Sequence, residues 1–351
     1  MLKEIHEQPE ALKNTLNGII HFNQPVQFVG FTLDKDYLKS LKHIYIVACG
    51  TAMHAGLVGK LAIEKLCRIP VTVEVASEFR YCDPIIDQNT LCIFISQSGE
   101  TADTIAALKL AHEKGAKTIA ISNVFESSIT READHTLYTH AGPEIAVAST
   151  KAYISQVGLI VAFAIYMSEV LEISGSLSDE LKKSLIELPN LIETVISHED
   201  QYKTIAQKLV NETDLFYIGR GNDYHIAMEG SLKLKEISYI HSEAYPAGEL
   251  KHGPIALIDK GTFVFGIITD PNIAEKTLSN LEEVRSRGAI IILITNQNIK
   301  VEHVVNIPNI NSIISPILAI IPLQFIAYFI AKEKGLDVDK PRNLAKSVTV
   351  E

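Results

Sequence analysis

A run of hydroxyl-bearing residues between an apolar strand and a helix is the segment of this sequence best suited to chemistry. The apolar residues 93–95 lead into Ser96-Gln97-Ser98-Gly99-Glu100-Thr101, and helical sequence follows. Backbone N–H groups at the start of a helix lack intrahelical partners and carry partial positive charge, so they attract anions. The hydroxyls would add further donors. The segment therefore predicts a phosphate site, and the alternative is an ordinary strand, turn and capped helix.

Four further residues carry groups that could move protons or form a covalent bond. Lys233 and Glu236 are three residues apart, so on a helix they share one face and can address one substrate. The alternative is a plain ion pair on a solvated face. His252 lies in turn-like sequence, and an imidazole that titrates near neutrality suits a proton shuttle, the alternative being a satisfied loop histidine.

Lys346 lies close to the chain end in a segment that alternates apolar and polar residues. A lysine that attacks a carbonyl must be partly deprotonated, which burial or a nearby cation such as Arg342 could achieve. The alternative for an amine in this place is a solvated charge with no further role.

Length and composition exclude several classes of protein. The chain has 351 residues, 47% of them hydrophobic, and a formal net charge of −10 without a basic block, which predicts two domains and no nucleic-acid partner. Its four cysteines have no C-x-x-C spacing, and three lie in or beside apolar runs. This pattern predicts buried thiols in a reducing cytoplasm and no metal cluster. The N-terminus has no apolar signal core, so no export signal is expected.

One apolar segment, Ile313–Ala331, approaches the length of a membrane span. It contains Pro316, Pro322 and Gln324, and we expect no second such segment in the chain. A buried core helix without membrane contact is therefore the prediction.

The sequence repeats its own pattern. The apolar strand and turn at 41–51 recur at 215–221, residues 113–123 match residues 286–296, and Ala76–Phe79 finds an echo in His241–Ala244. Apolar strands that alternate with helices predict parallel sheets covered on both faces. The fold class is therefore α/β, with two tandem sandwiches. The expected bounds are 1–40 for a helical lead-in, 41–174 and 212–338 for the two sandwiches, 175–211 for a helical connector and 339–351 for a tail.

Ligands of open parallel sheets bind beyond the carboxyl ends of the strands. The turns at Gly50-Thr51, at 96–101 and at Gly219-Arg220-Gly221 all follow predicted strands. The last turn begins like a dinucleotide motif, but Tyr224 stands where the third glycine of G-x-G-x-x-G would be. We therefore expect no cofactor.

Five motifs together resemble the isomerase half of the glucosamine-6-phosphate synthase family, also called glutamine-fructose-6-phosphate aminotransferases. The resemblance covers the chain from Lys3-Glu-Ile-His-Glu-Gln-Pro9 to its end. The motifs are Ser96–Thr104, Val147-Ala-Ser-Thr-Lys151, Glu229–His241, Ala247–Pro254 and Pro341–Glu351.

The resemblance implies two sugar isomerase (SIS) subdomains that convert fructose 6-phosphate to the glucose configuration. It also implies a homodimer with a shared active site, because His252 would reach the site from the partner subunit. Glu236 would be the base, Lys233 its neighbour, His252 the ring-opening residue and Lys346 the Schiff-base lysine. By the same resemblance, the phosphate would bind Ser96, Gln97, Ser98 and Thr101, and the sugar would lie beside Gly50, Thr51, Val147, Ser149 and Ala345.

The sequence also departs from the family. A complete synthase begins with a glutaminase domain, which this chain lacks, so we expect either an excised domain or a natural isomerase-only protein, and we favour the former. Ala52, Pro143 and Ala146 replace a serine, a threonine and a glycine of the family pattern, which affects affinity more than reaction type. Two other functions stay open: a deglycase of fructose-amino-acid phosphates, and a sugar-phosphate sensor without chemistry.

Overall fold

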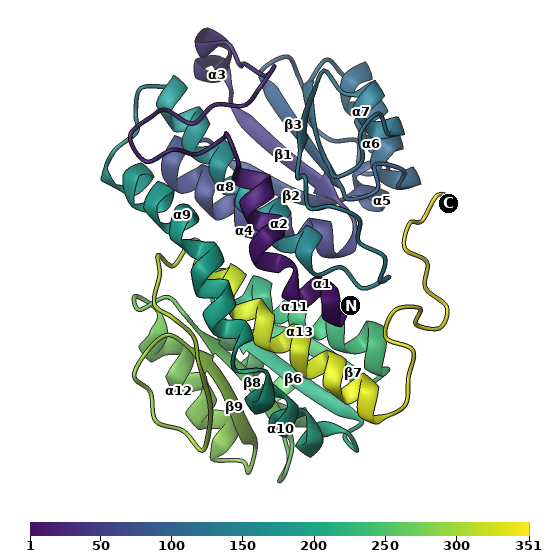
Figure 1. Ribbon diagram of the computed structural model, residues 1–351, viewed down its shortest axis with the longest axis vertical. Helices are drawn as coiled ribbons and strands as arrows, with labels where there is room; N and C mark the ends of the chain where they lie inside the picture. The colour runs from purple at the N-terminus through teal and green to yellow at the C-terminus, as the bar shows by residue number, and fades with distance from the viewer. Residues whose placement is uncertain (351) are drawn as a thin grey trace. The chain divides into compact units, whose positions relative to one another are not determined.

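The computed structural model describes residues 1–350, so Glu351 of the predicted tail lies outside the described residues. Two compact units organise the chain, each with one five-stranded sheet (Figure 1). The first unit comprises Glu7–Glu144, Ser149–Pro189 and the tail from Ala345. The second comprises Met1–His6, Ile145–Ala148 and Asn190–Leu344. The domain bounds expected from the sequence stay a prediction.

The sheet of the first unit is parallel throughout, with the strand order β2-β1-β3-β4-β5. Its central strand is buried at every residue, as expected for a sheet covered on both faces. The strands are β1 (His43–Ala48), β2 (Val71–Val75), β3 (Thr90–Ser96), β4 (Lys117–Ser122) and β5 (His135–Tyr138).

Helices cover both faces of this sheet. In Figure 1, α4 and α8 lie on one face and α5, α6 and α7 on the other. Pro9 stands in the first turn of α2, where a missing N–H removes no helical hydrogen bond, and α2 packs on α8. The helices are α2 (Gln8–Leu16), α3 (Lys35–Ser40), α4 (Gly50–Cys67), α5 (Ala76–Phe79), α6 (Ala102–Glu113), α7 (Ser128–Glu132) and α8 (Lys151–Val170).

The sheet of the second unit has the corresponding order, β10-β9-β8-β6-β7, and is also parallel. When the two orders are aligned, β6 corresponds to β1, and β8 corresponds to the central strand β3. The strands are β6 (Asp214–Gly219), β7 (His241–Pro246), β8 (Phe263–Ile268), β9 (Ile290–Thr295) and β10 (His303–Asn306).

In the second unit, α10 and α11 pack on α13, while α12 packs on β8, β9 and η1. The predicted connector is helical, with α9 and α10, and α9 contains Pro189 at the division between the units. The elements are α1 (Leu2–His6), α9 (Ser176–Ile196, shared by the units), α10 (Glu199–Leu209), α11 (Asn222–Ser238), η1 (Ala247–His252), η2 (Pro254–Leu257), α12 (Ala274–Arg285) and α13 (Ser315–Glu333).

The longest predicted repeat is confirmed, and a shorter one is wrong. After α6 and after α12 the chain turns at Gly115 (φ 91°) and Gly288 (φ 96°), left-handed conformations that favour glycine, and enters β4 and β9. The proposed match of Ala76–Phe79 with His241–Ala244 fails, because the first is a helical turn and the second lies inside β7. Similar residue types here occupy different elements.

Within residues 1–350, two helices are long and apolar enough to cross a membrane by length and composition, Lys151–Val170 and Ser315–Glu333. The expectation of a single such segment is therefore wrong. Both helices lie mostly inside the fold, with 89% and 94% of the apolar window buried, so core packing accounts for their composition. The buried helix predicted at Ile313–Ala331 is confirmed as α13.

The four cysteines are free thiols in different surroundings. Cys67 and Cys92 are buried, and burial raises the pKa of each to about 12. Cys49 is half-buried and Cys82 is exposed. Two cysteines are therefore buried, where the apolar runs predicted three.

Candidate active site

The loop between β3 and α6 is shaped by a glycine. Gly99 has φ 70°, and a Cβ built on it would lie 2.0 Å from the Ser127 hydroxyl oxygen and 2.4 Å from the Ser127 Cβ. Both the backbone conformation and the lack of space therefore require glycine here. The Gly99 carbonyl accepts a hydrogen bond from the Ile129 N–H at 3.0 Å, which ties the loop to α7.

The hydroxyls of this loop organise its backbone. The Ser96 Oγ accepts a hydrogen bond from the Gly99 N–H at 3.1 Å and lies 3.0 Å from the Thr101 Oγ1. The Ser98 Oγ accepts from the Glu100 N–H at 3.2 Å. Thr101 is the N-cap of α6 but makes no side-chain capping bond. The loop therefore presents hydroxyls beside a helix start that no side chain caps, which is a suitable setting for an anion.

Glu100 is the acidic residue of the loop, and its charge is engaged by α7. Its carboxylate accepts hydrogen bonds from the Ser128 hydroxyl at 2.6 Å and from the Ser128 N–H at 2.8 Å. These two bonds hold the pKa of Glu100 below its usual value. The carboxylate is thus held at the first residue of another helix.

The C-terminal tail lies on this loop within the first unit. The Ser347 Oγ is 2.9 Å from the Ser98 Oγ, and the Ala102 N–H at the start of α6 donates to the Val348 carbonyl at 3.1 Å. These contacts join residues about 250 positions apart in the sequence. The predicted phosphate loop and the residues next to Lys346 therefore form one local site.

Lys346 is bound to a buried carboxylate. Its Nζ donates to the Glu144 Oε2 at 2.6 Å, where 25% of the lysine side chain and none of the glutamate side chain is exposed. The Ser149 hydroxyl donates to the same oxygen at 2.8 Å. Lys346 is therefore not the solvated terminal charge of the alternative interpretation. Arg342, the cation proposed as its neighbour, belongs to the second unit and lies over the Tyr239 ring at 4.2 Å.

The remaining binding residues predicted for the first unit lie beside the same sheet. Gly50 (φ 54°) and Thr51 begin α4 directly after β1, and Gln97 follows β3, whose residues pair with β1. The Gln97 carbonyl accepts from the Asn123 N–H at 3.2 Å. Ala345 begins the part of the tail that belongs to this unit.

In the second unit, α11 carries a buried charge cluster. The Lys233 Nζ lies 2.6 Å from the Glu236 Oε2 and 3.4 Å from the Glu229 Oε1. The side chains of Lys233 and Glu229 are fully buried, while 19% of Glu236 is exposed. The predicted common face is confirmed, and the alternative of an ion pair on a solvated face is wrong.

Two other predicted residues also belong to the second unit. His252 is exposed at the end of η1. The Val147 N–H donates to the Asp339 carbonyl at 3.0 Å. The structure thus brings Ser96, Ser98, Ser149 and Lys346 together in one unit and places Val147, Lys233, Glu236 and His252 in the other.

Sequence reasoning missed the carboxylates that brace the segment before α8. Glu144 binds Lys346, the Glu7 carboxylate accepts from the buried Lys151 amine at 2.6 Å, and the Glu4 Oε1 accepts from the Ala146 N–H at 3.1 Å. Glu4 and Glu7 lie in the N-terminal motif that carried part of the resemblance. Glu7 was a signal there, since the buried Lys151 needs an anionic partner, whereas Glu4 binds only backbone N–H groups of this segment.

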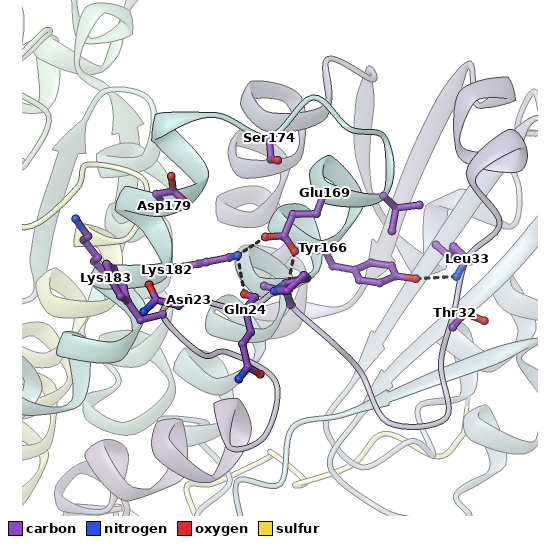
Figure 2. Close-up of a pocket in the computed structure, with 14 residues that line it drawn as sticks. Asn23, Gln24, Thr32, Leu33, Tyr166, Glu169, Ser174, Asp179, Lys182 and Lys183 are labelled. Carbon is purple, nitrogen blue, oxygen red and sulfur yellow. Dashed lines mark hydrogen bonds and ion pairs between the residues drawn. The ribbon is translucent and has the colours of Figure 1, made fainter.

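A cavity of about 910 Å³ in the first unit lies elsewhere, between the segment 22–33 and the helices α8 and α9. Figure 2 shows the Lys182 amine directed at the Glu169 carboxylate and at the Gln24 carbonyl, to which it donates at 3.0 Å. Glu169 also accepts from the Val26 N–H at 2.7 Å. None of the predicted site residues lines this cavity. The ion pair joins the segment 22–33 to α8 and α9 through its hydrogen bonds with Gln24 and Val26.

Comparison with known proteins gives consistent matches over the whole chain. The model of the SIS domain matches residues 37–166 and 208–325. The glutamine–fructose-6-phosphate aminotransferase (isomerizing) of Clostridium tetani is 53% identical over 360 residues, and that of Caldanaerobacter subterraneus is 52% identical. Each match covers all of this chain but 59% of the relative, so the chain spans little more than half the length of these proteins.

Solved structures agree in fold. The C-terminal domain of glucosamine-fructose-6-phosphate aminotransferase from Francisella tularensis superposes with a TM-score of 0.91 at 38% identity, over 97% of both chains. A glucosamine-6-phosphate deaminase from Thermotoga maritima has a TM-score of 0.77 at 23% identity, a likeness of fold alone.

Proposed function

This chain belongs to the SIS family, within which it matches the C-terminal isomerase domain of glutamine–fructose-6-phosphate aminotransferases, and on that premise we propose that it isomerises fructose 6-phosphate. The product is glucose 6-phosphate when the sugar alone is present and glucosamine 6-phosphate when ammonia is supplied. In a longer protein, a glutaminase domain would be the source of that ammonia.

One observation carries this proposal: the tail that bears Lys346 is hydrogen-bonded to the loop suited to phosphate. A phosphate bound at Ser96, Ser98 and Thr101 fixes one end of the sugar. Lys346 lies one residue before Ser347, which contacts Ser98. The amine is therefore attached to the segment that lies on the phosphate loop, as a reaction several carbons from the phosphate requires.

The proposed chemistry assigns one task to each group. His252 opens the sugar ring, and the Lys346 amine attacks the ketone carbon C2 to form a Schiff base with loss of water. Ammonia, or water in its absence, then attacks C2 and releases the Lys346 amine, which leaves an imine or a ketone at C2. Glu236 takes a proton from C1 of this released intermediate and returns it to C2, and the buried Lys233 keeps the Glu236 carboxylate in place at 2.6 Å. No metal or cofactor takes part in these steps.

The proposal includes the assembly and location of the protein. The functional unit is a homodimer in which His252 reaches the active site of the partner subunit. The location is the cytoplasm, because four unpaired cysteines fit a reducing compartment.

Product analysis tests the proposed reaction. Incubation with fructose 6-phosphate should give glucose 6-phosphate, and addition of ammonium should give glucosamine 6-phosphate. Binding of the sugar without either product would favour the sensor. Turnover of a fructose-amino-acid phosphate with no turnover of fructose 6-phosphate would favour the deglycase.

Mixed dimers test the shared site. Inactive His252→Ala and Lys346→Ala chains, when combined, should recover part of the wild-type activity because one of the two sites then holds both residues. Lack of recovery in dimers verified to contain both chains would contradict a site shared between subunits.

A further inference from the structure

One fully buried carboxylate touches the reacting nitrogen but has no part in the chemistry described above. Glu144 follows β5 in the first unit, and its side chain has no exposed surface. A buried charge is tolerated only when partners satisfy it. Its hydrogen bonds show what each of its two oxygens does.

The two oxygens of Glu144 have different partners. Oε1 accepts from the Thr150 N–H at 2.9 Å and from the Ala152 N–H at 3.1 Å, at the start of α8. Oε2 accepts from the Lys346 amine at 2.6 Å and from the Ser149 hydroxyl at 2.8 Å. One oxygen thus caps a helix, and the other is directed to the amine.

The charge of Glu144 is favoured in this position. Burial works to raise the pKa of Glu144, but the Lys346 ammonium and the N–H groups of Thr150 and Ala152 together hold that pKa below its usual value. The helix start adds a favourable dipole. Because its pKa lies below the ordinary value, Glu144 is an anion at neutral pH.

We propose that Glu144 is the counter-ion of the Lys346 nitrogen, first as the ammonium and then as the cationic Schiff base. The inference rests on the proposed function and adds a residue to it. Glu144 orients the amine in the free protein. After the sugar has bound, it stabilises the positive charge that activates the neighbouring carbon.

The charge balance of the reaction supports this role. The ammonium and the ketone become a protonated C=N bond and water: the C2–oxygen bonds break, and the departing oxygen carries away two protons from nitrogen. The net charge is +1 before and after, so a fixed carboxylate suits both states. A protonated imine draws electrons from C2 and so makes C2 easier for ammonia or water to attack, the step that releases the Lys346 amine.

A competing role is that Glu144 serves only to cap α8. The two roles predict opposite orders of reaction rate for two variants of Glu144. Glu144→Gln keeps an oxygen for the two N–H groups but places an amide NH₂ against the lysine. Glu144→Asp keeps the charge but is one methylene shorter, so its reach to the helix start is impaired.

The test is the rate of borohydride trapping of fructose 6-phosphate on Lys346, located by peptide mass spectrometry. We expect Glu144→Gln to lower the rate at saturating sugar about 30-fold, with the half-saturating sugar concentration changed less than about twofold. Glu144→Asp should retain more of the rate than Glu144→Gln. Glu169→Gln, which removes a half-buried carboxylate paired with the buried Lys182 in the same unit, is the control and should trap at close to the wild-type rate.

A faster rate in Glu144→Gln than in Glu144→Asp would overturn the proposal and leave the capping role. A second measurement does not depend on the sugar or on the folding of the Glu144 variants. In Lys346→Met, the carboxyl ¹³C signal of Glu144 should titrate at higher pH than in the wild type, and an unchanged titration would overturn the ion pair. If the wild type forms no adduct at all, the proposed function fails, and the titration still decides about the ion pair.

Discussion

The loops after the two central strands occupy equivalent places in the two sheets but differ in their chemistry. Both precede helices of twelve residues, whose N-caps are Thr101 and Ile273. Counting back from these caps, Ser98 corresponds to Asp270, Gly99 to Pro271 and Ser96 to Ile268. In the first unit the loop presents hydroxyls beside a helix start, while the second unit has a carboxylate there.

The second loop satisfies its donors internally. The Asp270 Oδ1 accepts from the Asn272 N–H at 3.0 Å and from its side-chain amide at 2.9 Å. The buried Asp223 carboxylate accepts from the Thr269 N–H at 2.9 Å. Where a phosphate would bind in the first unit, the second already holds two carboxylates. The same fold therefore supplies two strand ends, and the loop residues decide which one suits an anion.

The largest effect is expected when the carboxylate of the second loop is placed in the first. Ser98→Asp puts a negative charge at the proposed phosphate site, and we expect the affinity for fructose 6-phosphate to fall about 1,000-fold, or about 4 kcal/mol. Isothermal titration calorimetry measures this. Ser98→Ala, which removes one hydroxyl, should cost about 1 kcal/mol. Equal losses in the two variants would contradict an anion site at this loop.

Asp223 should make the stability of the second unit depend on pH. Burial raises the pKa of Asp223 to about 7, although the hydrogen bonds from Thr269 oppose the rise. Because the pKa of Asp223 is raised in the folded state, the contribution of Asp223 to stability is complete below the ordinary pKa of 3.8. It is lost as pH rises to about 7. The loss is at most about 4 kcal/mol.

Urea unfolding of the wild type and Asp223→Asn between pH 4 and pH 8 measures this contribution. The difference in unfolding free energy between the two proteins should change in favour of the variant as pH rises through this range. Parallel curves would show that Asp223 does not titrate there.

Gly99→Ala should destabilise the first loop by about 3 kcal/mol, from backbone strain and the clash with Ser127. Gly115→Ala is the matched control, because Gly115 also has a positive φ but no atom within 4 Å of an added Cβ. Gly115→Ala should be destabilised by backbone strain alone, which costs about 1 to 2 kcal/mol. Urea unfolding measures both, and equal losses would argue against the close approach of Ser127.

The smallest effect is expected from the reverse exchange. Asp270→Ser gives the second loop a hydroxyl, but Pro271 fixes φ near −65° and cannot follow the path that Gly99 takes at φ 70°. We expect no phosphate binding in the second unit and a change in stability within about 0.5 kcal/mol. Phosphate titration monitored by NMR would reveal a new site if the loop path did not matter.

The fold could be predicted from the sequence because its signals are local. Apolar strands ending at hydroxyls or glycines, and helices ending at Gly115 and Gly288, recur within short windows and predicted the two parallel sheets. The family resemblance found in the motifs is confirmed by the comparisons. The predicted match of Ala76–Phe79 with His241–Ala244 was wrong because short matches of residue type do not specify a helix or a strand.

Within the site, the shared face of Lys233 and Glu236 was predictable because helix periodicity places residues three apart side by side. The partner of Lys346 was not, since Glu144 lies 202 positions earlier and nothing in the sequence pairs the two. The contact of Ser347 with Ser98 spans 249 positions and was hidden for the same reason. Such contacts come from tertiary packing. The roles of these residues stay predictions.

In the proposed reaction, the loop of the first unit binds the phosphate while Lys346 forms the bond to the sugar. The most direct measurement is borohydride trapping of fructose 6-phosphate in the wild type and in Ser98→Asp, with the modified peptide identified by mass spectrometry. We expect one adduct on Lys346 in the wild type and a large loss of it in Ser98→Asp at the same sugar concentration. An adduct on another lysine, or equal trapping in the two proteins, would contradict it.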